Sequence, residues 1–498
     1  MTAVRVVAVA AALGMVQAVI APVAIARPGP AWGDCAGFVG APPPGAVTIE
    51  CARVPVPLRY DRPQGRRISI GISRIKAAKP AERRGVLLTN PGGPGPDGLF
   101  TWAAMVQAKM LPEQVTQRYD LIGVSPRGTD NGTPLDCSGY VAARTPESPF
   151  APEADFARNC GKNSGELLPE VTTENTARDM DEVRAALGEQ RIGFVSGSYG
   201  SYLGAVYATL FPRRLTRLAL SGAVHLDWIW RPHRFAQPEA REIRITDFFA
   251  WLAERHATAG FGSTAAEARR TWDELRARLD REPIRDPQFP DLLLTGGRLT
   301  SGTGFASNGR GAWPLTEKML KEIREQGTAR RMLGLLAALG GDSIQSFPGG
   351  EHYKAPTVWS VFAAVTCGEA RWPRNPAAYQ RAAEHLGSRY PFIGREAGLA
   401  DVPCAFWPHP PKPQVKIADN GLAVPPLIMH AHRDPATPFA GGPAMAQRLG
   451  GRLLQVTGGD HGFLFGYTPC VDSALLAYLD TGALPAPGSV CEQAPVPG

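Results

Sequence analysis

Short apolar runs alternate with amphipathic segments in the first part of this chain and again near its end. Apolar runs bounded by Gly, Pro or Asn are typical of buried strands, and apolar positions three and four apart predict helices. The predicted strands are 47–58, 67–76, 84–89, 119–124, 191–195, 215–220, 426–431 and 452–456. The first two are predicted to pair as a hairpin across the turn residues 60–65. Strands that alternate with helices indicate a mostly parallel sheet with helices on both faces.

The middle of the chain, residues 226–415, loses this alternation. Helices are predicted beside the strands at 176–187, 201–211, 442–449 and 470–478, whereas the middle has only helical patterns, at 246–257, 265–280, 315–326, 330–339 and 376–386. We therefore expect a large, mainly helical cap at 226–415, inserted between two parts of one α/β core at 27–225 and 416–498.

The first 26 residues have the pattern of a secretory signal peptide. One Arg precedes a stretch of mostly small apolar residues, and Ala24-Ile25-Ala26 resembles a cleavage site. A membrane anchor is the alternative, but Gln17 and Pro22 interrupt the apolar stretch. We expect a secreted protein without stable membrane insertion after cleavage.

Export would place the eight cysteines in an oxidising compartment, where an even number favours disulfides. Many pairings are possible, and the clustering along the chain favours neighbours. The predicted pairs are Cys35–Cys51, Cys137–Cys160, Cys367–Cys404 and Cys470–Cys491. A metal site is the alternative, but the sequence has no C-x-x-C and no closely spaced Cys/His pair.

The charge pattern argues against a nucleic-acid partner. The net charge of +7 comes from scattered arginines without a block of like charges.

Residues 194–204, Phe-Val-Ser-Gly-Ser-Tyr-Gly-Ser-Tyr-Leu-Gly, have the pattern of a nucleophile elbow centred on Ser198. A strand-to-helix turn that projects a serine hydroxyl packs so tightly that the residues two before and two after the serine must be small. Ser196 and Gly200 meet this requirement, although the usual motif has Gly at both positions. Ser198 is therefore the predicted nucleophile.

A serine nucleophile needs a histidine base that a carboxylate orients. His461 lies in a loop after the last predicted strand, and Asp434 directly follows the strand before it. Parallel sheets carry their chemistry at such strand ends. The order Ser198, Asp434, His461 is that of the α/β-hydrolase triad.

Other polar residues near strand ends are weaker candidates. His430 and His432 lie on or beside a strand and are interpreted as sheet or loop histidines. His225 and Asp227 follow the strand at which some hydrolases keep the triad acid. Asp460 would point away from its neighbour in an extended strand end, so we expect it to be solvated or structural.

Acyl transfer also needs donors for the developing oxyanion. The backbone N–H of Tyr199, directly after the nucleophile, is one candidate. Gly92 or Gly93, in a glycine-rich loop after a predicted strand, would supply the other, because glycine lets the backbone approach a ligand closely.

Together these motifs resemble the secreted actinobacterial tripeptidyl aminopeptidases and their prolyl-iminopeptidase-like relatives among the α/β hydrolases, which have a C-terminal TAP-like segment. The matching segments are 90–95 (NPGGPG), 119–128 (YDLIGVSPRG), 198–204 (SYGSYLG), 367–369 (CGE), 404–407 (CAFW), 434–438 (DPATP), 459–462 (GDHG) and 470–491. The resemblance covers nearly the whole mature chain.

The resemblance implies a bacterial, extracellular serine hydrolase that releases short N-terminal peptides, often tripeptides, without a metal or organic cofactor. An exopeptidase must also recognise a free α-ammonium group, for which Glu369 is the first candidate and a solvated surface Glu the alternative. Trp407 is expected either to line the acyl pocket or to pack in the core. The sequence does not indicate an oligomeric state.

Several residues depart from the usual family pattern. They are Ser196 for Gly, Ser125 for Asp, Ser221-Gly222 for Asp-Gly, and Pro96-Asp97-Gly98 where the loop usually continues with Gly-Ser. None belongs to the predicted triad, so we expect hydrolysis to persist while the substrate can differ. Two alternatives therefore stay open: an esterase or amidase acting on small-molecule acyl compounds, and a catalytically inactive binding protein.

Overall fold

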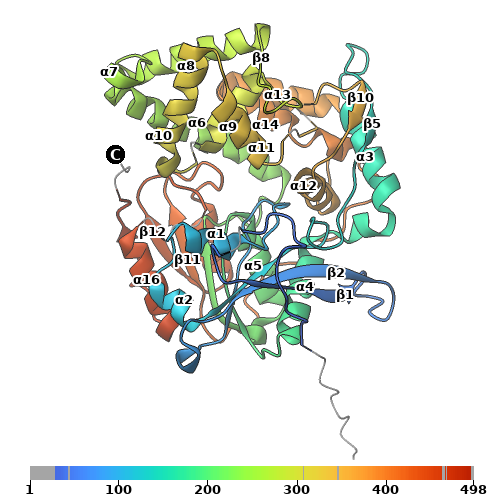
Figure 1. Cartoon of the computed structure of the whole chain (residues 1–498), viewed down its shortest axis with the longest axis vertical. Coiled ribbons are helices and arrows are strands. Elements are labelled where there is room, and N and C mark those ends of the chain that lie inside the picture. Colours follow the sequence, from blue (N-terminus) through green and yellow to red (C-terminus); the bar gives the residue numbers. More distant parts are fainter. Residues whose placement is uncertain are drawn as a thin grey trace, which may run out of the picture.

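The computed structural model of the chain has two layers, a sheet-containing core and a helical cap above it (Figure 1). It describes residues 29–42, 45–306, 308–341, 343–344, 347–462, 466 and 468–494. The predicted signal peptide lies outside these residues. None of the described helices combines the length and apolarity that a membrane span requires.

The core is built on one large sheet, which in the described residues has nine strands in the order β1-β2-β4-β3-β6-β7-β11-β12-β13. These strands are β1 (Glu50–Pro57), β2 (Arg67–Ile75), β3 (Val86–Leu88), β4 (Asp120–Val124), β6 (Ile192–Gly197), β7 (Leu215–Ser221), β11 (Leu427–Ala431), β12 (Arg452–Val456) and β13 (Val490–Cys491). Strands β1 and β2 form the predicted hairpin, β2 runs antiparallel to β4, and all other neighbours are parallel. The prediction of a mostly parallel sheet is confirmed.

Helices cover both faces of this sheet. One face packs on α4 (Thr173–Ala186), α5 (Tyr199–Leu210) and α15 (Gly441–Arg448), and the other on α1 (Thr101–Gln107), α2 (Glu113–Arg118) and α16 (Pro469–Thr481). Successive strand residues point to opposite faces. Phe194 accordingly joins the hydrophobic cluster of α4 and α5, and Val195 joins that of α1 and α16.

Helix α4 begins three residues before the predicted start at 176. Its first turn is polar and has no apolar periodicity, so the pattern of apolar residues begins too late to mark it. The side chain of Thr172 accepts a hydrogen bond from the Asn175 N–H and caps the helix. This cap is the sequence signal that marks the true start.

The cap is mainly helical and has its own hydrophobic cluster, which includes Phe248, Phe249 and Trp272. Its helices are α6 (Arg231–Glu254), α7 (His256–Ala259), α8 (Ala265–Arg281), α9 (Gly296–Ala306), α10 (Trp313–Lys321), α11 (Arg330–Ala338), α12 (Thr357–Gly368), α13 (Ala377–Arg389) and α14 (Gly394–Leu399). Helix α6 begins well before the predicted segment 246–257. The sequence pattern did not predict its first half, because that half is mostly polar and contains Pro238.

Two elements that precede residue 225 lie against the cap. Strand β5 (Gly139–Val141) pairs with β10 (Glu351–Tyr353), and α3 (Ala151–Ser164) packs on the turn at Val402–Phe406. Figure 1 shows both beside α12 in the upper layer. Residues that precede position 225 therefore pack against the cap as well. The predicted boundary between core and cap at residue 225 stays a prediction.

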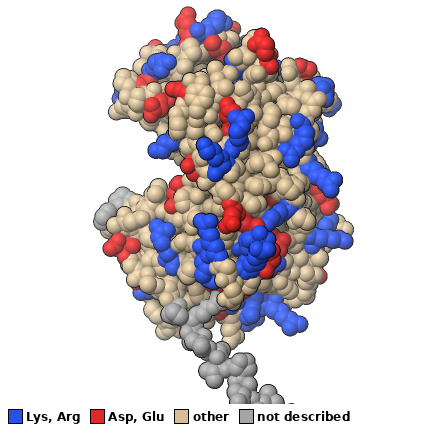
Figure 2. Space-filling model, turned by 90° about the vertical axis from the view of Figure 1, so that its right-hand side faces the viewer, with Lys and Arg blue, Asp and Glu red and all other residues tan. Residues whose placement is uncertain are grey.

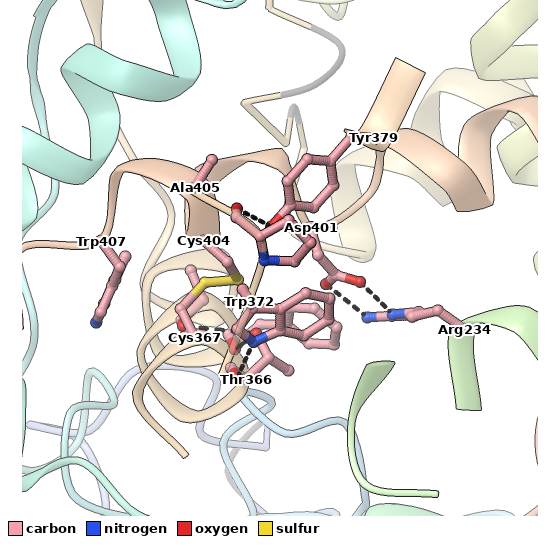
Figure 3. Close-up of a disulfide and its surroundings, with 12 residues drawn as sticks. Arg234, Thr366, Cys367, Trp372, Tyr379, Asp401, Cys404, Ala405 and Trp407 are labelled. Carbon is pink, nitrogen blue, oxygen red and sulfur yellow. Dashed lines mark hydrogen bonds and ion pairs between the residues drawn. A yellow bond between two sulfur atoms is a disulfide. The ribbon is translucent and has the colours of Figure 1, made fainter. Parts of the chain in front are cut away.

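The four predicted disulfides form, between the predicted neighbours. Cys367–Cys404 joins the end of α12 to the Val402–Phe406 turn (Figure 3). Four disulfides fit an oxidising compartment outside the cytoplasm. Basic and acidic side chains are interspersed over both layers on the face in Figure 2, and the outline narrows between the layers.

Candidate active site

Ser198 lies in a strained turn between β6 and α5. Its backbone has φ 58° and ψ −134°, a positive φ that is uncommon for a residue other than glycine. The Ser198 N–H donates to the carbonyl of Ser221 at 3.0 Å, and the Ser201 hydroxyl donates to the Ser198 carbonyl at 2.6 Å. Such strain persists only where the surrounding structure enforces it, and it is common at functional sites.

The turn is too tight for side chains at two glycines. A methyl group at Gly200 would lie 1.7 Å from Ser196 Oγ, and one at Gly92 would lie 2.9 Å from Ser198 Cβ. The predicted small-residue requirement is thus confirmed at Gly200. The close approach of Gly92 also shows that the glycine-rich loop lies directly against Ser198.

The predicted oxyanion donors differ in their surroundings. Tyr199 is the first residue of α5, so its N–H has no acceptor within the helix and lies at the positive end of the helix dipole. The Gly92 N–H instead donates to Asn90 Oδ1 at 2.9 Å. Because this bond occupies Gly92, the candidate donor from the loop is Gly93.

His461 and Asp434 are in direct contact. His461 Nδ1 lies 2.8 Å from Asp434 Oδ1 and 2.9 Å from Oδ2. A carboxylate at Nδ1 favours the tautomer with its proton there, which leaves Nε2 as the basic nitrogen. The N–H groups of Ala436 and Thr437 also donate to Asp434 Oδ1, at 2.9 and 2.7 Å.

The environment keeps Asp434 ionised. Burial would raise the pKa of this carboxyl group, but the charge and hydrogen bond of His461 outweigh it, with help from the Thr437 N–H. The pKa of Asp434 is therefore lowered, and the carboxylate can stabilise a protonated His461.

The loops that carry these residues touch one another. A methyl group at Gly197 would lie 3.0 Å from the carbonyl carbon of Gly462, the residue after His461. The Ser221 hydroxyl donates to the Gly462 carbonyl at 2.6 Å. A methyl group at Gly222 would lie 3.1 Å from Asp434 Oδ2. The ends of β6, β7, β11 and β12 thus bring the loops that carry Ser198, Asp434 and His461 into contact, and the hydrogen bond within the predicted triad that the described residues show is that of His461 with Asp434.

The other histidines near the strand ends make other hydrogen bonds. His430 is buried, and its Nε2 lies 2.8 Å from the Thr437 carbonyl and 4.0 Å from Asp434 Oδ2. His432 Nε2 lies 3.0 Å from Gln455 Oε1. His225 stacks on Trp228.

The acidic alternatives are also engaged elsewhere. Asp227 is exposed and pairs with Arg448 at 3.0 Å. Asp460 accepts a hydrogen bond from Arg244 at 2.5 Å, so it is structural, as expected.

The residues that depart from the family pattern contact the site loops. Ser196 is fully buried and its hydroxyl donates to the Asn90 carbonyl at 2.7 Å. Ser125 Oγ donates to Asp97 Oδ2 at 2.7 Å. A carboxylate from the glycine-rich loop, that of Asp97, therefore lies beside position 125.

Glu369 is buried rather than solvated. Its carboxylate accepts hydrogen bonds from the N–H and hydroxyl of Thr173, the latter at 3.1 Å, and from Trp230 Nε1 at 3.3 Å. Burial raises its pKa to about 7 against these hydrogen bonds. Sequence reasoning missed Thr173 and Trp230, since both lie far from Glu369 in the chain.

Glu369 lies in the shared wall of two cavities, of about 400 and 460 Å³. The first cavity is also lined by Asp61, Glu170 and Glu174. Helix α5 links this region to Ser198, because the Tyr199 hydroxyl lies 2.9 Å from Thr173 Oγ1. The side chain of Tyr199, the residue after the nucleophile, therefore contacts a residue that hydrogen-bonds to Glu369.

Trp407 is 3% exposed and packs in the main hydrophobic cluster. In Figure 3 its ring points away from the cluster of Trp372 and Tyr379. Trp407 is not among the residues that line the two cavities beside Glu369. Its contact with substrate stays a prediction, and core packing is what the described residues show.

Comparisons with known proteins agree with this architecture. Residues 85–284 match the family model described as alpha/beta hydrolase fold, and residues 390–491 match the model described as TAP-like protein. The tripeptidyl aminopeptidase of Streptomyces coelicolor is 33% identical over 493 residues, which cover 95% of this chain and 88% of that protein.

More distant relatives carry other names. Serine protease Hip1 of Mycobacterium tuberculosis is 28% identical over 89% of this chain and 87% of its own. Carboxylesterase B of the same species is 28% identical over 94% of this chain and 91% of its own. Among solved structures, a hydrolase from Pseudomonas aeruginosa PA01 aligns with a TM-score of 0.36 at 14% identity, covering 86% of this chain and 98% of that one.

Proposed function

The chain belongs to the family of α/β-hydrolase enzymes that contains the Streptomyces tripeptidyl aminopeptidases, and we propose that it is a secreted exopeptidase that releases short, tripeptide-like N-terminal peptides. The observation that carries the proposal is the contact of His461 with the buried Asp434, in a loop that touches the strained turn of Ser198. Secretion is supported by the disulfides.

The proposed mechanism is acyl transfer through Ser198. His461 Nε2 accepts the hydroxyl proton as Ser198 Oγ attacks the scissile carbonyl, and Asp434 stabilises the imidazolium. The N–H groups of Tyr199 and Gly93 donate to the oxyanion. His461 then protonates the leaving amine, and the C–N bond breaks to leave an acyl-enzyme. Water, activated by the same histidine, hydrolyses the ester and restores the serine.

Glu369 is the proposed acceptor for the substrate α-ammonium group. It is a buried acid at the wall of two cavities, and the hydroxyl of Tyr199 lies beside its partner Thr173. An ammonium group would offset the burial that disfavours the Glu369 carboxylate. An acid placed in this way distinguishes an unblocked peptide from one whose amine is acylated.

The test compares three substrates of the purified enzyme. These are Ala-Ala-Pro-anilide, its N-acetylated form and a short neutral acyl ester. We expect the free-amine peptide to be cleaved at least 10-fold faster than the acetylated form, since a lost charged hydrogen bond costs about 1.5–3 kcal/mol. Equal cleavage of blocked and free peptides would contradict the exopeptidase. Turnover of the ester alone would support an esterase, and no turnover at all would support a binding protein.

A further inference from the structure

Helix α6 of the cap lies against both loops that carry the predicted acid and base. Near its start, Gln237 Nε2 donates to the carbonyl of Ala436, two residues after Asp434, at 2.8 Å. Two turns later, Arg244 pairs with Asp460, the residue before His461. Residues three or four apart share a helix face. Arg241, four residues after Gln237 and three before Arg244, therefore faces the space between the two loops.

The contacts of Arg241 confirm this position. Its Nη1 donates to Asn308 Oδ1 at 3.3 Å and to the Gly304 carbonyl at 3.5 Å, both long bonds to neutral groups. The Asn308 carbonyl accepts the backbone N–H of His461 at 2.9 Å. One residue, Asn308, thus bridges the Arg241 guanidinium and the backbone of the proposed base.

Arg241 differs from the other inward-facing arginines of α6 because no carboxylate of the described residues pairs with it. Arg234 is bidentate to the buried Asp401 at 2.8 and 3.3 Å (Figure 3), and Arg244 pairs with Asp460 and Asp247. Burial, together with the charge of Arg234, lowers the pKa of Arg241 to about 10, and the charge of the Asp434 carboxylate offsets this only in part. It therefore stays charged at neutral pH.

Arg241 is half-buried, so its charge is partly desolvated while its guanidinium stays open to a ligand, and a hydrogen-bonded anion would stabilise it. Arginine presents a planar fork of donors that matches a carboxylate. We propose that Arg241 binds a carboxylate of the substrate, on the leaving-group side of the scissile bond. The side follows from the chemistry: the histidine that protonates the leaving amine must lie beside it, and Asn308 links Arg241 to the backbone of that histidine.

This proposal rests on the proposed exopeptidase function and narrows its substrate class. The leaving group is short and carries the carboxylate, because only one residue, Asn308, separates Arg241 from the backbone of His461. The carboxylate comes either from the free C-terminus of a short peptide or from an acidic side chain of the leaving residue. With an ammonium group at Glu369, the preferred substrate is a short peptide charged at both ends.

The experiment measures kcat/KM for three peptides that share the released tripeptide: Ala-Ala-Pro-Ala with a free C-terminus, its C-terminal amide, and Ala-Ala-Pro-Asp amide. The wild-type enzyme should prefer at least one of the two peptides that carry a carboxylate over the Ala-Ala-Pro-Ala amide, by about 10-fold or more. A preference for the free acid alone assigns the C-terminus, a preference for the Asp amide alone assigns the side chain, and a preference for both shows that either carboxylate is bound.

Substitutions test whether Arg241 causes the preference. Arg241→Gln should reduce the ratio of the preferred carboxylate peptide to the Ala-Ala-Pro-Ala amide to about 1, and Arg241→Lys should keep part of it. Arg255→Gln, which removes a half-exposed arginine directly after the last residue of α6, should keep the wild-type ratio.

Three results would overturn the proposal. Equal wild-type rates on both Ala-Ala-Pro-Ala forms and on the Asp amide would do so without any variant, and would leave the exopeptidase function intact. A full preference that survives in folded Arg241→Gln would assign it to another group. Failure to cleave any of the peptides would instead contradict the exopeptidase function, and this inference with it.

Discussion

The hydroxyl of Ser196 donates a hydrogen bond of 2.7 Å to the backbone carbonyl of Asn90. Asn90 is held a second time, because its side-chain oxygen accepts the Gly92 N–H at 2.9 Å. Ser196, which replaces the usual glycine of the elbow, therefore connects β6 to the glycine-rich loop by a hydrogen bond. The same hydroxyl occupies the space that a side chain at position 200 would need.

This packing predicts that Gly200→Ala destabilises the protein by about 1–3 kcal/mol, the usual cost of overpacking a core. The new methyl group would lie 1.7 Å from Ser196 Oγ and 3.0 Å from Ser196 Cβ. Both contacts vanish in Ser196→Gly, so the double variant Ser196→Gly/Gly200→Ala should recover most of the loss. Urea unfolding of the three variants measures it, and a double variant no more stable than Gly200→Ala would contradict the account.

A second prediction concerns the support of His461 by the cap. Asp460→Asn removes the charged partner of the buried Arg244, and it alters the residue directly before the base. We expect kcat to fall by about 10-fold with little change in KM, since small displacements of a catalytic group carry costs of this size or larger.

Asp480→Asn is the matched control for Asp460→Asn. It breaks a pair with Arg118 whose members are both partly exposed, at 3.0 Å, far from the site in the fold. Such pairs contribute little, so kinetics should stay at the wild-type level. An equal loss of activity in both variants would contradict the prediction, because removal of any negative charge would then explain the lower kcat of Asp460→Asn.

The pH dependence of amine recognition follows from Glu369. Its pKa of about 7 means that the carboxylate forms as pH rises from about 5.5 to 7.5, below the pKa of about 8 at which a peptide amine loses its proton. The ratio of kcat/KM for free-amine peptide to that for neutral ester should rise over this range, because both substrates use the same triad. Glu369→Gln should flatten the ratio, and a rise that persisted in that variant would exclude Glu369.

Much of the fold was predictable because it depends on local patterns. Alternating apolar runs and amphipathic segments gave the parallel sheet, and small residues around Ser198 gave the elbow. The order of Ser198, Asp434 and His461 at strand ends then predicted that their loops lie together, and the structure shows the side-chain contact of Asp434 with His461.

The remaining features depend on contacts between distant residues, which no local pattern encodes. Strands β5 and β10 each have three residues and lie about 200 positions apart, so no hairpin signal joins them. The first half of α6 lacks apolar periodicity, so the sequence pattern did not predict the part of this helix that carries Arg241. The hydrogen bond that the Gly92 N–H donates depends on the conformation of the Asn90 side chain.

The central claim is that Ser198, activated by His461 and Asp434, is the nucleophile. A fluorophosphonate probe followed by peptide mass spectrometry tests it most directly. We expect stoichiometric modification of Ser198 in the wild-type protein, strongly slowed modification in Asp434→Asn, since this change in a triad lowers kcat by about 10⁴-fold, and none in Ser198→Ala. Labelling that continued unchanged in Ser198→Ala, or that mapped to another serine in the wild-type protein, would contradict the account.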